Sequence, residues 1–113
     1  MRTAINPMGN IDMAKDYIID YGNNGLSGND YQWYRIWKSG WIEQGGNATS
    51  NIEFNFIKPF LNIPTITGLM INTDSQYTHT WRCFSVNNKS AKFIGAYSGT
   101  IYAYSFNCYA CGY

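Results

Sequence analysis

The stretch "YRIWKSGWIEQGG", Tyr34 to Gly46, contains two tryptophans, a tyrosine and three glycines within thirteen residues. Ser39 and Gly40 suit the two central positions of a tight hairpin turn, because glycine tolerates a positive φ angle. The stretch therefore predicts a β-hairpin. Its expected cross-strand pairs are Trp37 with Ile42, Arg35 with Gln44, and Trp33 with Gly46.

Neither face of this predicted hairpin is polar throughout. Each face carries three large apolar side chains: Trp33, Trp37 and Ile42 on one, and Tyr34, Ile36 and Trp41 on the other. A hairpin with one solvated face normally alternates apolar and polar residues. We therefore expect one face to cover the core of the domain and the other to contact a second chain or a ligand. The alternative is a monomer with an ordinary Trp- and Tyr-rich surface.

Outward from the hairpin, short strand candidates alternate with turn residues. The candidates span residues 17–21, 31–37, 41–44, 51–57, 65–72, 78–86, 91–97 and 100–110. Segment 45–50 is expected to be a loop, 65–72 a central strand, and 91–97 with 100–110 a last hairpin. No stretch has the spacing of an amphipathic helix. The pattern predicts an all-β, antiparallel sandwich or barrel-like knob of about eight short strands.

Length and composition restrict the partners of the chain. Its 113 residues favour one domain, 18% are aromatic, 13% are charged, and the net charge is +1. The basic residues are scattered singly, so we expect no nucleic-acid groove and no anionic membrane surface as partner. The sequence has no recognisable signal peptide, no apolar run near the roughly 20 residues that span a bilayer, and no phosphate-binding glycine loop. We expect a soluble protein made in a cytoplasm, without membrane insertion and without a cofactor.

The three cysteines are Cys83, Cys108 and Cys111, an odd number. Cys108 and Cys111 fall in a strand candidate, where residues three apart point to opposite faces. They are therefore expected to be small apolar side chains rather than metal ligands or disulfide partners. The sole histidine is His79. No metal site is expected within one chain.

Three segments of the sequence together resemble a known family: "YQWYRIWKSGWIEQGG", "IEFNFIKPFLNIPTITGLMI" and the ending "FNCYACGY". They are similar to the C-terminal tip domain of phage and prophage tail fibres, although Asn107 and Cys108 replace bulkier residues of that pattern. The resemblance covers residues 16–113. Residues 1–15, which are polar and broken by Pro7 and Gly9, then form a connector or the end of a fibre shaft.

The resemblance implies a β-sandwich tip that forms a homotrimer at the distal end of a fibre in the virion. Such a tip attaches to a polysaccharide or protein on the bacterial cell surface. The matching motif positions are interpreted as fold and subunit-contact residues: Trp33, Arg35, Gly40, Trp41, Glu43, Gln44 and Gly45.

Candidate receptor contacts come from side-chain chemistry, because planar rings pack on sugars and polar side chains bind hydroxyl groups. The candidates are Tyr77, His79, Arg82, Tyr97 and Tyr109. Alternatively, these side chains fill the core or the subunit seam.

Two other functions remain open. The chain can be a trimerisation cap of the fibre without receptor binding. It can also be a small glycan hydrolase that uses Glu43 and Glu53 as facing carboxyl groups. We expect no enzyme, because no nucleophile signature accompanies His79. Three copies of His79 on a threefold axis offer an alternative metal site.

Overall fold

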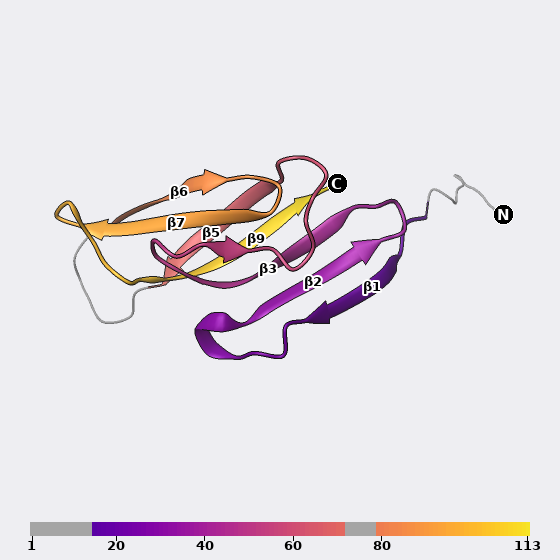
Figure 1. The fold of residues 1–113 in the computed structure, drawn as a ribbon, viewed down its shortest axis with the longest axis horizontal. Coiled ribbons are helices and arrows are strands. Elements are labelled where there is room, and N and C mark those ends of the chain that lie inside the picture. Colours follow the sequence, from indigo (N-terminus) through magenta and orange to yellow (C-terminus); the bar gives the residue numbers. More distant parts are fainter. Residues whose placement is uncertain (1–14, 72–78) are drawn as a thin grey trace.

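The computed structural model of the chain describes residues 15–71 and 79–113, so most of the expected connector 1–15 lies outside the described residues. The described residues form an antiparallel all-β structure (Figure 1), which confirms the expected fold class. They contain nine strands and one short 3-10 helix, η1. The bounds are β1 Ile18–Asn23, η1 Gly28–Asp30, β2 Gln32–Trp37, β3 Ile42–Thr49, β4 Phe54–Asn55, β5 Thr65–Ile71, β6 Thr80–Val86, β7 Ser90–Tyr97, β8 Thr100–Ile101 and β9 Ser105–Gly112. In this part of the chain, no helix has the length and apolar character needed to cross a membrane.

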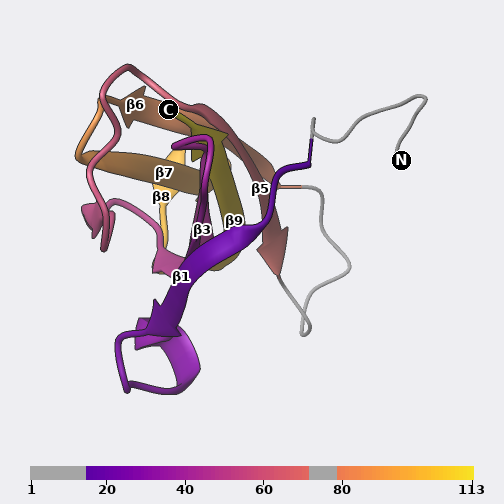
Figure 2. The same ribbon diagram turned by 90° about the vertical axis from the view of Figure 1, so that its right-hand side faces the viewer.

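The strands form two sheets that pack as layers. The first sheet has five strands in the order β1-β2-β3-β9-β5, and the second has the order β4-β7-β6 with β8 paired to β7. Figure 2 shows the layers from the end of the molecule, with β6 and β7 over β9 and β3. Both views place β1 at the margin of the molecule, away from β6 and β7. The outer edge strands of the first sheet are therefore β1 and β5.

The core lies between the two sheets and is rich in phenylalanine. Phe93 of β7 stacks on Phe106 of β9, with ring centroids 5.2 Å apart. Gly68 of β5 makes room for this pair, because a Cβ atom there would lie 2.7 Å from the Phe93 ring. The other buried apolar residues are Ala48, Phe54, Phe56, Phe60, Ala91, Cys108 and Ala110. The closeness of the aromatic packing explains why a glycine is needed within an otherwise apolar strand.

The hairpin of β2 and β3 forms as expected, but its register differs by one residue from the prediction. Arg35 faces Glu43, Trp33 faces Gly45, and Ile36 faces Ile42. The reason is a turn with three central residues instead of two. The Trp37 amide donates to the Trp41 carbonyl over 2.8 Å, and Gly40 adopts a φ angle of 95°. A shift of one residue turns every side chain of β3 to the opposite face.

Several other expected elements differ from the structure. Segment 45–50 is mostly strand, because β3 continues to Thr49 beside β9. Only Phe54–Asn55 of segment 51–57 is strand, and Ile52 is 60% exposed although it shares the alternation of the buried Phe54 and Phe56. Strand β5 lies at an edge rather than at the centre of its sheet. The last hairpin is limited to β7 and β8, and the chain then crosses to the first sheet as β9.

Candidate functional site

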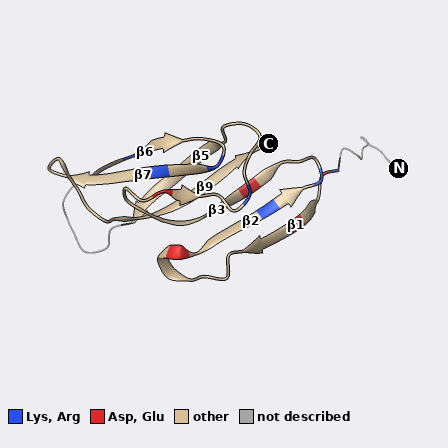
Figure 3. Cartoon of the chain, in the orientation of Figure 1, with Lys and Arg blue, Asp and Glu red and all other residues tan. Residues whose placement is uncertain are grey.

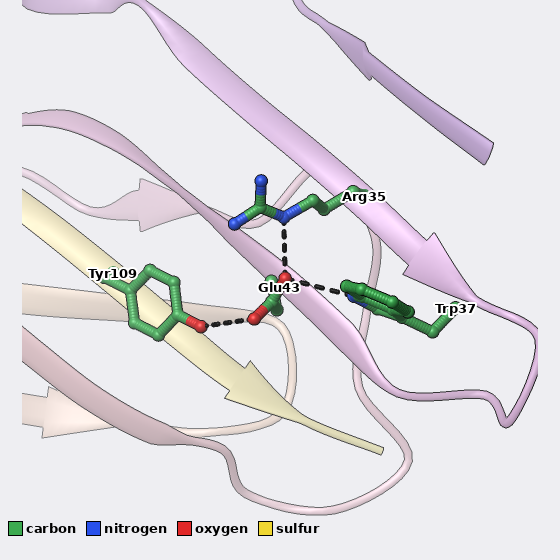
Figure 4. A network of polar contacts seen from close by, with 4 residues as sticks. All are labelled: Arg35, Trp37, Glu43 and Tyr109. Carbon is green, nitrogen blue, oxygen red and sulfur yellow. Dashed lines mark hydrogen bonds and ion pairs between the residues drawn. The ribbon is translucent and has the colours of Figure 1, made fainter. Parts of the chain in front are cut away.

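The outer face of the first sheet carries a polar network around Glu43 (Figure 4). Arg35 Nε lies 2.6 Å from Glu43 Oε1, and the indole of Trp37 donates to the same oxygen over 3.0 Å. The Tyr109 hydroxyl donates to Glu43 Oε2 over 2.7 Å. Arg35 and Trp37 are two positions apart in β2, so their side chains point to the same face of the sheet. In the observed register Arg35 pairs with Glu43, so the Glu43 side chain lies on this face as well. The network therefore joins three neighbouring strands: β2, β3 and β9.

The electrostatics of this network keep Glu43 ionised and Tyr109 protonated. Burial opposes the charge of Glu43, but hydrogen bonds from Tyr109, Trp37 and Arg35 together outweigh it and lower the pKa of the carboxyl group. Burial, together with the hydrogen bond to Glu43, raises the pKa of Tyr109 to about 12. The side chain of Glu43 is only 16% exposed, whereas that of Arg35 is 42% exposed. Arg35 is thus the solvent-facing member of the pair, and its guanidinium also lies 5.1 Å from the Trp33 ring.

Gln44 points to the opposite side of β3 and is buried. Its amide nitrogen donates to the Lys58 carbonyl over 2.5 Å, and its amide oxygen accepts from the Lys58 backbone over 3.1 Å. These two bonds fix the segment between β4 and β5 against the first sheet. Both polar atoms of the Gln44 side chain thus bind backbone groups of Lys58, and the side chain is only 1% exposed.

The other motif residues also have identifiable contacts. Gly40 occupies the hairpin turn with a φ angle of 95°, and the Trp41 ring packs edge-on against Tyr113 at 5.1 Å. At Gly45, a side chain would collide with the backbone carbonyl of Cys108 in β9. At Gly46, φ is 145° and a side chain would collide with the carbonyl of Tyr31. The paired glycines thus permit close approach of β3 to its neighbours on both sides.

Strand β1 exposes its large side chains, although it is rich in apolar residues. Ile18, Ile19 and Tyr21 of β1 are 41%, 59% and 78% exposed, and Tyr17 directly before the strand is 52% exposed. A groove of about 510 Å³ is lined mainly by residues of β1 and β2, including Ile18, Tyr21 and Trp33. Exposed apolar edge strands are usually covered or blunted in natural proteins. This margin of the first sheet is therefore an apolar surface that the described residues leave uncovered.

The residues predicted to bind a receptor do not form one cluster. His79 lies between two tyrosine rings, with centroids 5.3 Å from Tyr97 and 4.9 Å from Tyr104. Arg82 lies on the outer face of the second sheet, while Tyr109 belongs to the Glu43 network on the first sheet. Tyr77 lies outside the described residues. Of the four members that the structure describes, His79 and Tyr97 come together, next to Tyr104 and its neighbour Tyr102.

A second surface was not predicted from the sequence. A groove of about 530 Å³ crosses the second sheet, and it includes Arg82 together with Trp81, Phe84, Ile94 and Ile101. Three strands, β6, β7 and β8, contribute these residues. Only the pairing of β6 with β7 and of β7 with β8 brings them together, so no local sequence motif identifies the groove.

The structure separates the two carboxyl groups considered for glycan hydrolysis. Glu43 is held by Arg35, Trp37 and Tyr109, whereas Glu53 accepts a hydrogen bond from Ser90 at the start of β7. They therefore belong to separate networks. Within residues 15–71 and 79–113, no group of three or more His, Cys, Asp or Glu residues could hold a metal ion.

All three cysteines are free thiols in the structure. Cys108 points into the core, and burial raises the pKa of its thiol to about 12. Cys111, three residues further along β9, is half-buried. Cys108 is therefore an inert core side chain, as expected from its position in a strand.

No protein-family model and no curated protein matches the sequence. Among solved structures, the chain is similar to an N-truncated R1-type pyocin tail fibre, with a TM-score of 0.55 and 16% sequence identity. The similarity covers 84% of this chain and 87% of that chain. The described two-sheet structure is therefore a tail-fibre-like fold.

Proposed function

We propose that this chain is a tip domain of a phage or phage-like tail fibre that binds a receptor on the bacterial surface as a homotrimer. The observation that carries the proposal is the fold similarity to a tail fibre over 84% of the chain. The proposed location is the distal end of the fibre in the virion, after synthesis in the bacterial cytoplasm. The receptor is a surface glycan or a surface protein.

The exposed strand β1 supports self-association. Its apolar side chains lie at a sheet edge that no other strand of the described residues pairs with, and a second copy of the chain can cover this surface. Arg35 and Trp33, which flank β1 on the same sheet, provide polar and aromatic contacts beside this edge. We assign the margin formed by β1 and β2 to the contact between subunits.

The direction of the chain supports a receptor role for the opposite end of the domain. Strand β1 begins at the right in Figure 1, and the turn between β7 and β8 lies at the left. His79 and Tyr97 are at the left end, because β6 begins there and β7 ends there. A fibre that enters at the start of β1 would direct these aromatic side chains away from its shaft.

We propose binding without catalysis. The ionised state of Glu43 is stabilised by three donors, which suits a structural carboxylate better than a general acid with a raised pKa. The rival function is a cap that keeps three fibre chains in register without contacting a receptor. A hydrolase remains the alternative that predicts release of sugar from surface glycans.

Two measurements test the proposal. Light scattering at micromolar concentration is expected to give three times the mass of the 113-residue chain, and a monomer would contradict the homotrimer. Adsorption of the fluorescent trimer to a panel of bacterial strains is expected to be strain-selective and saturable. A trimer that adsorbs to no strain would favour the cap, and sugar release from isolated cell-surface glycans would favour the hydrolase.

A further inference from the structure

The groove on the outer face of the second sheet combines an apolar base with a cationic rim. Ile94 of β7 and Ile101 of β8 lie in the groove, and Arg82 of β6 lies beside them. The guanidinium of Arg82 lies 5.3 Å from the centre of the Phe84 ring. Phe84 remains 52% exposed, whereas the Trp81 ring turns toward the core and packs edge-on against Phe106, with ring centroids 5.8 Å apart. The groove therefore offers one exposed ring, that of Phe84, beside a planar group of N–H donors.

Strand β6 has a bulge beside this groove, because its pairing with β7 is irregular between Cys83 and Ser85. Arg82 pairs with Ile94, and the neighbouring Phe93 is buried in the core, so Arg82 and Ile94 lie on the outer face. Arg82 and Phe84 are two positions apart in β6, and the Arg82 guanidinium lies over the Phe84 ring.

The charge of this sheet favours an anion. Strands β4, β6, β7 and β8 contain Arg82 and Lys92 but no Asp or Glu. Figure 3 shows the same distribution, with blue segments and no red on β6 and β7. Glu53 precedes β4 but is bound to Ser90 at the start of β7, whereas the groove lies toward the end of β7 at Ala96. A ligand in the groove would thus meet a positive potential without an opposing carboxylate from these strands.

One wall of the groove is fixed by buried hydrogen bonds. Asn51 lines the groove and has a φ angle of 62°, a conformation that few non-glycine residues adopt. Its amide donates to the Phe93 carbonyl over 2.7 Å. The preceding Ser50 is buried, and its hydroxyl accepts from the Gly95 amide over 2.9 Å. The backbone of Asn51 is thereby held at a defined position against β7, and its side chain is exposed at the groove.

We propose that this groove binds an anionic saccharide, and this inference rests on the receptor-binding role proposed above. Arg82 pairs with the carboxylate or phosphate of the sugar, because its guanidinium can donate two parallel hydrogen bonds to such a group. The exposed ring of Phe84 packs on the C–H face of the sugar, and Asn51 binds its hydroxyl groups. The groove is open along the sheet, which allows a polymer chain to continue beyond it.

The test is titration of the assembled protein, labelled with ¹⁵N, with three probes: trigalacturonic acid, glucose 1-phosphate and neutral maltotriose. We expect trigalacturonic acid or glucose 1-phosphate, at up to about 10 mM, to shift the resonances of Arg82, Phe84 and Ile101. The probe that binds identifies a carboxylate or a phosphate as the recognised group. Maltotriose is expected to bind at least about tenfold more weakly, since the charge pair is lost.

Matched variants separate the groove from general charge. Arg82→Gln is expected to weaken binding at least about tenfold, and Arg82→Lys to give an intermediate loss. Lys92→Gln removes the same charge from the same sheet outside the groove, and less than about a twofold change is expected. Equal losses in Arg82→Gln and Lys92→Gln, or absence of binding by both anionic probes, would overturn the inference.

Cell adsorption distinguishes this inference from the proposed function. If the protein adsorbs to cells and Arg82→Gln adsorbs equally well, the receptor role stands and the groove is not its site. If the anionic probe binds through Arg82 but the trimer adsorbs to no strain, the groove stands and the receptor role fails. Thermal unfolding of each variant verifies that loss of binding is not loss of folding.

Discussion

The Tyr109 hydroxyl lies 2.7 Å from Glu43 Oε2, although the two residues are 66 positions apart in the sequence. This bond connects β9 to β3, which are neighbouring inner strands of the first sheet. Arg35 and Trp37 bring β2 into the same network. Glu43 therefore stabilises three strands through one carboxylate.

Replacing Tyr109 with phenylalanine tests this connection. Because the hydroxyl donates to a charged group that is only 16% exposed, we expect Tyr109→Phe to lower the free energy of unfolding by about 2 kcal/mol. Urea unfolding at fixed protein concentration measures the loss. The matched control is Tyr21→Phe, because Tyr21 is 78% exposed, and a change below about 0.5 kcal/mol is expected there. Equal effects in the two variants would show that the Glu43 contact contributes nothing.

The pH dependence of stability should reflect the same pair. The pKa of Glu43 is lowered on folding, so its contribution is present above the unfolded pKa, near 4.5, and is lost as the pH falls through the lower folded value. The pKa of Tyr109 is raised from 10.0 to about 12, so its contribution is present below pH 10 and is lost as the pH rises toward 12.

Urea midpoints measured from acid to alkaline pH test both limits. Glu43→Gln is expected to be less stable at neutral pH and to lose stability less steeply below pH 4.5, because the titrating group is gone. Tyr109→Phe is expected to flatten the alkaline limit. An acid limit that is unchanged in Glu43→Gln would assign the effect to other carboxyl groups.

The close approach of β3 to the preceding segment makes Gly46 irreplaceable. Its φ angle is 145°, and a Cβ atom would collide with the Tyr31 carbonyl. We expect Gly46→Ala to lower the free energy of unfolding by at least about 3 kcal/mol or to prevent folding. Gly25→Ala is the control, because Gly25 has a φ angle of 75° but nothing within 4 Å of its Cβ position. That variant should lose only about 1 to 2 kcal/mol, measured by the same urea unfolding.

The exposed edge strand β1 predicts which substitutions would disturb the association of subunits. Ile19 in β1 is 59% exposed, so a lysine there should leave the isolated fold intact but place a charge in the proposed subunit contact. We expect Ile19→Lys to convert the proposed homotrimer to a monomer at micromolar concentration in analytical ultracentrifugation. Leu61→Lys is the control, because Leu61 is 86% exposed and lies outside β1 and β2. Retention of the trimer in Ile19→Lys would exclude this edge from the contact.

The strands could be predicted from sequence where alternation and turn residues agree. Strand β7 and the segment around β2 were found within one or two residues, because apolar strand formers lie between clear turn signals. The continuation of β3 through Gly45 to Thr49 was missed because its composition is that of a loop. This segment is a strand because it pairs with β2 on one side and β9 on the other. Both neighbours approach so closely that only glycine fits at positions 45 and 46.

The surfaces were harder to predict than the strands. The pairing of Arg35 with Glu43 depends on one extra turn residue, which composition does not encode, and an error of one position reverses the faces of β3. Tyr109, whose role as a receptor contact stays a prediction, hydrogen-bonds to Glu43, because β9 lies beside β3 rather than in a hairpin with β7. Long-range strand order therefore decides which side chains meet.

Both ends of the domain are attached to the turn between β2 and β3. Asp16 accepts hydrogen bonds from the backbone and hydroxyl of Ser39, and Tyr113 packs on Trp41. The β7–β8 turn and the tyrosines that follow it lie at the opposite end. Substitutions and insertions at that far end therefore leave the contacts of Asp16 and Tyr113 with the β2–β3 turn unchanged. In the receptor-binding role proposed above, this division would separate attachment to the fibre from recognition, so that specificity could change while the attachment to the shaft stays the same.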